Sequence, residues 1–439
     1  MFTKKVTSII LVFAFSLFKT QSVNLDNRDK VLISGNLRNF LMSTDNLKGK
    51  DYWADALGGN LKFEYKPVKH ISIGVSASYL SKVLSSDLDE KDLGSGKSSK
   101  WERELFDLSS PENAYAVSRL NQFYVQYQNG KSKLTIGKIP VEYSPLINPS
   151  DGRMLPIEYG GLSWNFTSGK SQVDVALLNS VSMRSNSEWS KIKDAIGVLD
   201  NGFQPDGSKV DYLNKSNALG ATIFHYGRKF RLADINFYNI HLDKILNTSW
   251  FQLGLNFPKW DLGFIYSYQI PDSYQNRLKY SERYVQPDEN GQVASFLLRY
   301  KIKKFAWEFA YSKAFDTGRF LFPKELGRDQ FFTSLPRSRM EGFRNVDIIK
   351  ATVLFHQGKW SAHSDFSISS GASENDFKNN KYNTDDFFQW NSFVAFRITN
   401  KLEVDLLYIF KRNLQTTNPI AVYQKTNYNQ LNLITNYWF

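Results

Sequence analysis

The sequence predicts an all-β protein, a transmembrane antiparallel β-barrel of about 18 strands with short turns at one rim and long loops at the other. Three observations predict this fold class. Short stretches alternate between apolar and polar residues, the connections between them are by turns very short and long, and the chain ends on the aromatic residue Phe439. A sandwich or a propeller would not separate loop lengths in this way.

The composition excludes a helical membrane protein. The 439 residues are 42% hydrophobic with a mean hydropathy of -0.41, and no apolar run reaches the roughly 20 residues that a spanning helix needs. A barrel strand faces lipid with only every second residue. The 34 Phe, 23 Tyr and 10 Trp exceed what one core requires, and two aromatic girdles at the lipid interfaces would take them up.

The N-terminus predicts a secretory signal peptide over residues 1–22, followed by one barrel domain over residues 23–439 without a separate plug. Lys4 and Lys5 precede an apolar stretch of about 13 residues from Val6 to Phe18, and small residues follow near Ser22. The chain has no cysteine, which fits an exported protein without disulfides and excludes an N-terminal lipid anchor.

The strands are predicted from a period of two. In residues 401–410, Leu402, Val404 and Leu406 share one face with the aromatic residues that follow, and the other face is more polar. The same phase marks residues 71–80, 261–270 and 305–312. Weaker examples are 31–41, 61–65, 120–127, 133–139, 293–300, 347–355 and 387–398.

The connections alternate in length, as an outer-membrane barrel requires. Eight tight turns are predicted, for example at residues 128–132 and 301–304, and each carries at least one Lys. Nine long segments are predicted between them, beginning near residues 42, 81, 140, 179, 239, 271, 313, 370 and 411. This order implies an even strand number with both ends of the barrel on the periplasmic side. The Lys residues are interpreted as solvated, with contact to lipid phosphates as the alternative.

The C-terminus resembles the assembly signal of outer-membrane barrels. Leu431, Leu433, Tyr437 and Phe439 fall on one parity, and Phe439 is the last residue. The resemblance implies that Tyr437 and Phe439 address the chain to the barrel assembly machinery, and that the protein resides in the outer membrane of a bacterial cell.

Two long segments differ from generic loops. Residues 138–164 contain four prolines, which restrict the backbone, and glycines that permit sharp reversals. Residues 322–347 hold Lys324 and several arginines, which can bind carboxylates through two hydrogen bonds at once. An eighteen-stranded barrel is too wide for wall side chains to fill, so selectivity must come from such loops and from inward-facing charges.

Both segments resemble the OprD family of outer-membrane porins. The similar stretches read NPSDGRMLPIEYGGLSW and ELGRDQFFTSLPRSRMEGFRNVD, and residues 36–39 (NLRN) resemble the opening strand of the family. The resemblance implies an eighteen-stranded monomeric barrel with an eyelet shaped by the third and seventh loops. It also implies a ladder of basic residues that guides substrate carboxylates. The stretch after the second strand, EYKPVKHISIGVSASYL, departs from the Gly-rich family pattern and leaves the ladder undefined there.

The resemblance places substrate-guiding or constriction residues at positions that match its motifs. These residues are Arg38, Asp151, Arg153, Arg328, Arg337 and Arg339. Parity alone adds four basic residues that could face the lumen, which are Lys62, Arg299, Lys350 and Arg397. For each of the four, solvation by lumen water is an equal alternative to guiding.

The expected function is passive diffusion of small anionic or zwitterionic solutes, such as amino acids and organic acids, with no enzyme activity, cofactor or metal. The formal charge of +12 fits anions or lipid phosphates as partners, because no nucleic-acid signature accompanies it. Two alternatives stay open. One is a barrel that acts as an adhesin or receptor, and the other is a barrel hydrolase, for which His356 and His363 are the candidate pair.

Overall fold

The computed structural model describes residues 31–108, 116–141, 144–150, 153–199, 202–415 and 424–439. Within these ranges the chain forms one closed antiparallel barrel of 18 long strands, with one additional two-residue strand, β8. The predicted fold class is therefore confirmed. The predicted signal peptide lies outside the described residues.

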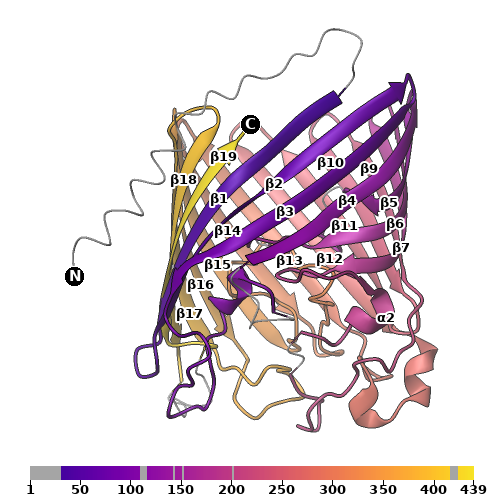
Figure 1. The fold of residues 1–439 in the computed structure, drawn as a ribbon. Helices are drawn as coiled ribbons and strands as arrows, with labels where there is room; N and C mark the ends of the chain where they lie inside the picture. The colour runs from indigo at the N-terminus through magenta and orange to yellow at the C-terminus, as the bar shows by residue number, and fades with distance from the viewer. Residues whose placement is uncertain (1–30, 109–115, 142–143, 151–152, 200–201, 416–423) are drawn as a thin grey trace, which may run out of the picture.

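The long strands run in chain order around the barrel (Figure 1). Their bounds are β1 (Val31–Asp45), β2 (Tyr52–Val68), β3 (Ile71–Ser85), β4 (Ala116–Asn129), β5 (Ser132–Ile139), β6 (Glu158–Ser168), β7 (Ser171–Ser182), β9 (Ala221–Lys229), β10 (Ala233–Leu242), β11 (Leu246–Asn256), β12 (Trp260–Pro271), β13 (Gln292–Ile302), β14 (Phe305–Ala314), β15 (Val346–Gln357), β16 (Trp360–Ser370), β17 (Phe387–Arg397), β18 (Leu402–Asn413) and β19 (Tyr428–Trp438). The short β8 (Ser190–Lys191) pairs with β7.

In the ranges that the structure describes, helix is confined to short segments of the connections. These are η2 (Arg103–Leu105), α2 (Ile192–Ala195), η4 (Ser273–Arg277) and η5 (Tyr280–Glu282). No helix in the described ranges is long and apolar enough to cross a membrane.

The barrel closes between its first and last strands. β1 pairs with β19 as well as with β2, and the backbone of Phe439 exchanges two hydrogen bonds of 3.1 Å with Gly35. Tyr437 lies opposite Leu37 and Leu402 in the register. The last residue of the chain therefore completes the ladder at the rim where β1 begins.

The two faces of the wall differ as the parity predicts. On β14, Phe305, Trp307 and Phe309 are about half exposed and point outward, whereas Ala310 and Ser312 point inward and are fully buried. Because a strand alternates its side chains between the two faces, one surface of the wall is apolar and the other polar or small.

The long loops gather at one rim, and the tight turns lie at the other (Figure 1). The prediction of a long connection beginning near residue 239 is wrong, because the structure has a short turn there between β10 and β11. β10 continues to Leu242, and a turn at residues 243–245 leads into β11. The polar residues that suggested a loop are inward-facing strand residues: Asn239 donates to Asn247 Oδ1 at 2.8 Å and to Ser249 Oγ at 3.0 Å.

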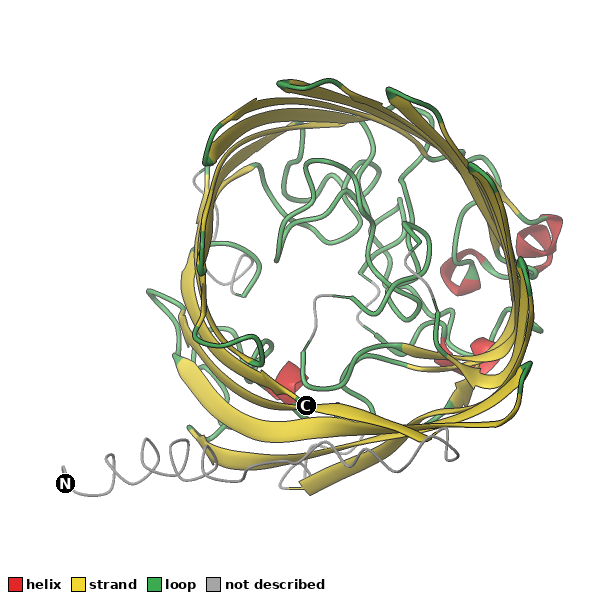
Figure 2. Cartoon of the chain, turned by 90° about the horizontal axis from the view of Figure 1, so that it is seen from above, coloured by secondary structure: helices red, strands yellow, loops and turns green. Residues whose placement is uncertain are grey.

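Several loops fold into the barrel instead of standing above it (Figure 2). We call residues 86–115 the second loop, 140–157 the third, 183–220 the fourth and 315–345 the seventh. Buried apolar residues of the third, fourth and seventh loops pack together with inner wall residues, including Ile147, Met183 and Phe331. A smaller apolar cluster joins the second loop to β1 and β2 through Leu105, Phe106 and Phe40. These clusters hold the loops inside the barrel.

Candidate functional site

The third and seventh loops meet inside the barrel. The Asn148 amide donates to the carbonyl oxygen of Arg328 at 2.8 Å, and the backbone N–H of Arg328 donates to Asn148 Oδ1 at 3.2 Å. The hydroxyl of Tyr159, at the start of β6, donates to the carbonyls of Asn148 and Leu326. Buried polar groups that satisfy one another in this way define a single loop arrangement.

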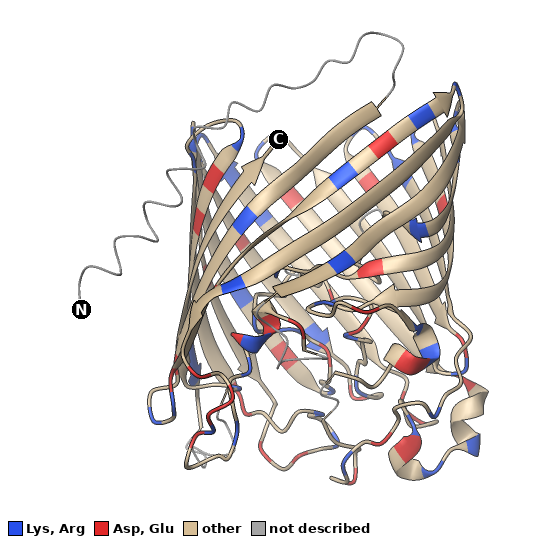
Figure 3. Ribbon diagram, viewed as in Figure 1, with Lys and Arg blue, Asp and Glu red and all other residues tan. Residues whose placement is uncertain are grey.

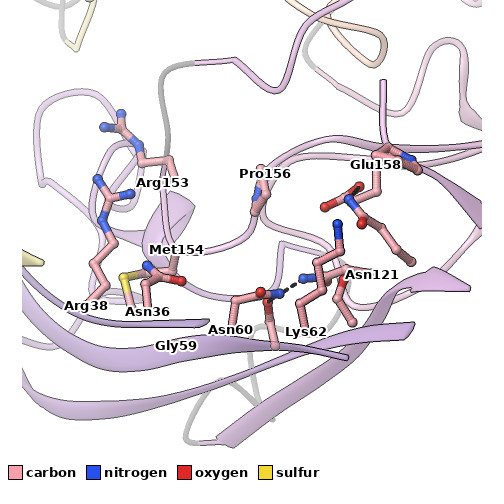
Figure 4. Close-up of a pocket in the computed structure, with 14 residues that line it drawn as sticks. Asn36, Arg38, Gly59, Asn60, Lys62, Asn121, Arg153, Met154, Pro156 and Glu158 are labelled. Carbon is pink, nitrogen blue, oxygen red and sulfur yellow. Dashed lines mark hydrogen bonds between the residues drawn. The ribbon is translucent and has the colours of Figure 1, made fainter. Parts of the chain in front are cut away.

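A cavity of about 310 Å³ lies between the third loop and the wall formed by β1 to β4 (Figure 4). Its charged lining groups are Arg38, Lys62, Arg153 and Glu158. The guanidinium groups of Arg38 and Arg153 lie beside each other at one end, and both lie over the ring of Phe40, at 5.4 and 6.0 Å. Glu158 lies at the other end with Lys62. The cavity therefore has a cationic end and an end of mixed charge.

Local strand geometry opens this cavity. Arg38 lies opposite Gly58 in the register of β1 and β2, so β2 has no side chain directly across from Arg38. Gly59, Asn60 and Lys62 of β2 line the cavity further along the strand. On β4 a register shift leaves Asn121 without a partner residue on β3, because Leu120 pairs with Ala77 and Gln122 pairs with Ser76. Asn121 and Gln122 consequently both line the cavity, which is how β-bulges redirect side chains.

Arg153 is held by an ion pair at the inner end of the third loop. One of its nitrogens lies 3.1 Å from Glu104 of the second loop, and Arg184 of the fourth loop lies 3.1 Å from the other oxygen of the same carboxylate. Arg153 and Arg184 are 3% and 6% exposed. One carboxylate thus joins two arginines, and the group as a whole keeps a positive excess.

A second cavity, of about 440 Å³, lies among the loops and is strongly basic. It includes Glu104 and Arg184, so the Glu104 ion pair separates it from the smaller cavity. Its only acidic lining groups among the described residues are Glu104 and Glu341. Its basic lining residues are Lys100, Arg103, Arg184, Lys324, Arg328, Arg337, Arg339, Lys411 and Lys425.

The three predicted arginines of the seventh loop all line this larger cavity, and each is fixed by hydrogen bonds. Arg337 donates to Gln430 Oε1 of β19 at 2.9 and 2.6 Å and lies 4.8 Å from the Trp101 ring. Arg328 donates to the carbonyls of Lys324 and Gly327, and Arg339 donates to that of Asp329. Arg337 has a positive φ of 76°, a strained conformation for a residue with a side chain.

The four basic residues chosen by parity all lie on the inner face, in different surroundings. Lys62 lines the smaller cavity, and Lys350 is 9% exposed on β15. Arg299 contacts Glu308 at 2.5 Å and Asp261 at 3.5 Å. Arg397 contacts Glu403 at 3.2 Å, and its side chain is 63% exposed at the tight-turn rim. Arg299 and Arg397 are therefore paired with carboxylates.

The predicted residue Asp151 lies outside the described residues. Several charged residues at the cavities were not predicted. They are Glu158 at the smaller cavity, and Lys100, Arg103, Glu104, Arg184, Lys411 and Lys425 at the larger one. Lys411 occupies the inward parity of β18, one residue beyond the range predicted for that strand, so extending the alternation would have found it. Glu158 precedes the alternating part of β6, and its place in the cavity depends on contacts that sequence alone does not contain.

Arg119 of β4 was also not predicted, and it links the wall to two loops. Its guanidinium donates to the carbonyls of Pro156, Met183 and Asn186 at 2.7 to 3.3 Å, and to the side chains of Asn121 and Ser182. It is 3% exposed. One planar side chain with five N–H groups therefore positions the third and fourth loops together.

Buried carboxyl groups in the loops predict a pH effect on stability. Burial raises the pKa of Glu102, which accepts hydrogen bonds from Thr44 and from Ser99, at 2.5 and 2.7 Å. A raised folded-state pKa contributes stability that is fully present below the ordinary pKa of about 4.5 and is lost as pH rises through the folded value.

We therefore expect Glu102→Gln, which cannot ionise, to remove this loss. Its free energy of unfolding relative to the unchanged protein should rise as the pH goes from about 4 to 8, on the order of 1.4 kcal/mol for each unit by which the pKa is raised, and its relative melting temperature should rise with it. Melting curves of both proteins across that range check this. A constant difference at all pH values would contradict it.

The two histidines of the predicted hydrolase pair, His356 and His363, lie on neighbouring strands. Across the β15–β16 hairpin, His356 lies opposite Ser361 and His363 opposite Leu354, so the two histidines do not face each other. Among the described residues, no group of three or more His, Asp or Glu side chains is placed to hold a metal ion.

Solved structures share this architecture. Acinetobacter baumannii OccAB4 matches with a TM-score of 0.69 and 14% identity, and Pseudomonas aeruginosa OccK9 (OpdG) with 0.73 and 12%. Pseudomonas aeruginosa OpdK with vanillate matches with 0.67 and 13%. Each match covers 93% of this chain and 98% of the other. No protein-family model and no curated protein sequence matches the chain. The predicted resemblance to the OprD porins is thus confirmed at the level of the fold, and the chain has their barrel architecture.

Proposed function

We propose that this chain is an outer-membrane channel for the passive diffusion of small solutes that carry a carboxylate. The observation that supports it most is the excess of basic residues in the two cavities inside the barrel. Counted over the described residues, the larger cavity has nine basic and two acidic side chains in its lining, and the smaller has three and one. The likeness in fold to known outer-membrane barrels supports the location.

The narrow regions would decide selectivity. Two unit charges about 4 Å apart interact by about 4 kcal/mol at an effective dielectric constant near 20, and by about 1 kcal/mol in bulk water. In wider regions, charges are screened beyond roughly 8 Å at physiological salt. Arg38 and Arg153 would therefore act more strongly in the smaller cavity than Arg397 at the exposed rim.

Zwitterions fit the smaller cavity as well as simple anions. A carboxylate can lie at the end that holds Arg38 and Arg153, while an ammonium or hydroxyl group meets Glu158 at the other end. The volume of about 310 Å³ is at the small end of the range for ligand pockets. Transport also requires release, so each site should bind weakly, with a dissociation constant near 1 mM, or about -4 kcal/mol.

The solved structure of OpdK with vanillate adds to this proposal. Vanillate is a carboxylate, and the barrel that carries it has the fold of this chain. We extend carboxylate passage to this protein on that likeness and on its own basic cavities. The arginines Arg153, Arg328, Arg337 and Arg339 would guide the solute from the loops toward Arg38. Arg299 and Arg397, which are paired with carboxylates, would contribute little.

Liposome swelling with three solutes of similar size tests the proposal. Gluconate is an anion, sorbitol is neutral, and glucosamine is a cation. We expect gluconate to enter vesicles that contain the purified barrel at least roughly fivefold faster than glucosamine, as about 1 kcal/mol of electrostatic preference predicts. Sorbitol should lie between them. Equal rates for gluconate and glucosamine would refute the charge selectivity, and no swelling at all would indicate a sealed barrel that serves as a receptor.

A further inference from the structure

The tight turns at one rim carry a continuous set of basic residues, which we call the basic collar. The eight connections between β2–β3, β4–β5, β6–β7, β9–β10, β11–β12, β13–β14, β15–β16 and β17–β18 contain no Asp or Glu. All members of the collar are exposed. They are Lys69, Lys131, Lys170, Arg231, Lys259, Lys303, Lys304, Lys359 and Lys401.

The opposite rim carries charges of both signs, unlike the turns of the basic collar. The second loop carries Asp87, Asp89, Glu90 and Asp92 close together among its lysines, so the excess of positive charge is not a uniform property of the connections. Figure 3 shows Lys and Arg at the upper rim, where the tight turns lie. Asp is otherwise among the residues that turns favour, and its absence from eight turns indicates a requirement beyond turn formation.

Aromatic rings form a band directly beside the collar. Trp260 and Tyr300, which are paired across β12 and β13, have ring centroids 4.4 Å apart. Trp360 and Phe396 repeat this arrangement at 4.3 Å on β16 and β17. Trp260 and Trp360 are 44% and 49% exposed. Exposed Trp and Tyr rings of a barrel mark the level of the lipid headgroups, so the collar lies at or just beyond that level.

Members of the collar also reach from one turn to the next. The Lys131 ammonium donates to Ser168 Oγ at 3.1 Å, and that of Lys359 donates to the carbonyl of Ile398 at 2.9 Å. Because an ammonium group has three N–H donors, such a bond fixes the side chain along the rim and leaves further donors for an anion. The collar is thus partly preorganised for phosphate oxygens.

We infer that the basic collar binds the headgroup phosphates of anionic phospholipids in the leaflet that faces the tight turns. The inference rests on the membrane location in the proposed function but not on conduction of any solute. Its physical basis is the attraction between juxtamembrane basic residues and anionic lipid, which falls off within a Debye length.

The test uses barrels reconstituted into phosphatidylethanolamine vesicles with a minority of phosphatidylglycerol. Spin-labelled phosphatidylglycerol and spin-labelled phosphatidylcholine report the fraction of each lipid that the protein immobilises. We expect a roughly fivefold preference for phosphatidylglycerol at low salt, the factor that one basic residue near an anionic surface supplies. Salt near 1 M, where the Debye length is about 3 Å, should abolish the preference in the unchanged protein.

Two matched variants locate the effect. In the collar variant, Lys131, Lys170, Lys259, Lys303, Lys304 and Lys359 are replaced by Gln. In the loop variant, the same replacement is made at six exposed lysines of the other rim, Lys48, Lys91, Lys97, Lys191, Lys209 and Lys378. The collar variant should lose the preference and the loop variant should keep it, although both lose the same net charge.

Three results would overturn the inference. They are no preference in the unchanged protein, a preference that survives in the collar variant, and binding of soluble acidic peptidoglycan fragments in place of lipid. Failure of the barrel to insert into vesicles would instead remove the membrane location that the proposed function also needs. Insertion and conduction without lipid preference would remove the collar inference alone.

Discussion

Replacing Arg38 by Gln is expected to lower the ratio of anion to cation permeability roughly fivefold or more. Arg38 lines the smaller cavity and faces the third loop across it. Even at the dielectric constant of bulk water, a unit charge about 4 Å from a passing ion contributes about 1 kcal/mol, and a low-dielectric wall increases that value. Reversal potentials across a KCl gradient measure the ratio directly.

Arg397→Gln is the matched control for Arg38→Gln. Arg397 is also an inward-facing strand arginine, but its side chain is 63% exposed and lies 3.2 Å from Glu403. Exposed ion pairs contribute little, and salt screens charges that line a wide opening of the channel. We therefore expect the permeability ratio to change less than about twofold. Equal effects of the two substitutions would show that total charge, and not position in the cavity, sets the selectivity.

The second large effect is expected for Arg119→Met, which removes the side chain that links β4 to the third and fourth loops. Three backbone carbonyls that accept from Arg119 would lose this donor, and each buried acceptor left unsatisfied costs about 1–3 kcal/mol. We expect a loss of at least about 2 kcal/mol in stability. Release of the loops from the lumen should also raise the single-channel conductance.

Heat-induced unfolding and single-channel recordings measure these two changes. Arg119→Lys, which keeps the charge but has fewer donors, should fall between the unchanged protein and Arg119→Met in both measurements. The control is Arg228→Met, an exposed arginine at the tight-turn rim, for which neither quantity should change. A normal melting temperature and normal conductance in Arg119→Met would contradict the anchoring role.

The barrel wall could be predicted from sequence because its rule is local. Alternation with a period of two reports which solvent each side chain meets, and it located strands such as β14 and β18 to within a few residues. It failed where polar residues fill the inner face close to a turn. Asn239 and Asn247 look like loop residues but pair with each other inside the barrel.

The arrangement inside the barrel could be predicted only in part. Prolines and arginines marked the third and seventh loops, but the contact between Asn148 and Arg328 joins residues 180 positions apart. Glu104 and Arg119 act through backbone carbonyls and ion pairs of loops that are distant in sequence. Such contacts depend on how each loop packs against the others, and no local pattern encodes that packing.

The reversal potential of the unchanged protein tests the central claim most directly. The purified barrel in a planar bilayer, with a KCl gradient across it, should conduct, and the reversal potential should have the sign of chloride preference. That result follows if solutes pass the basic cavities that contain Arg38 and Arg337. A reversal potential with the sign of potassium preference, or a membrane that stays sealed, would contradict the account.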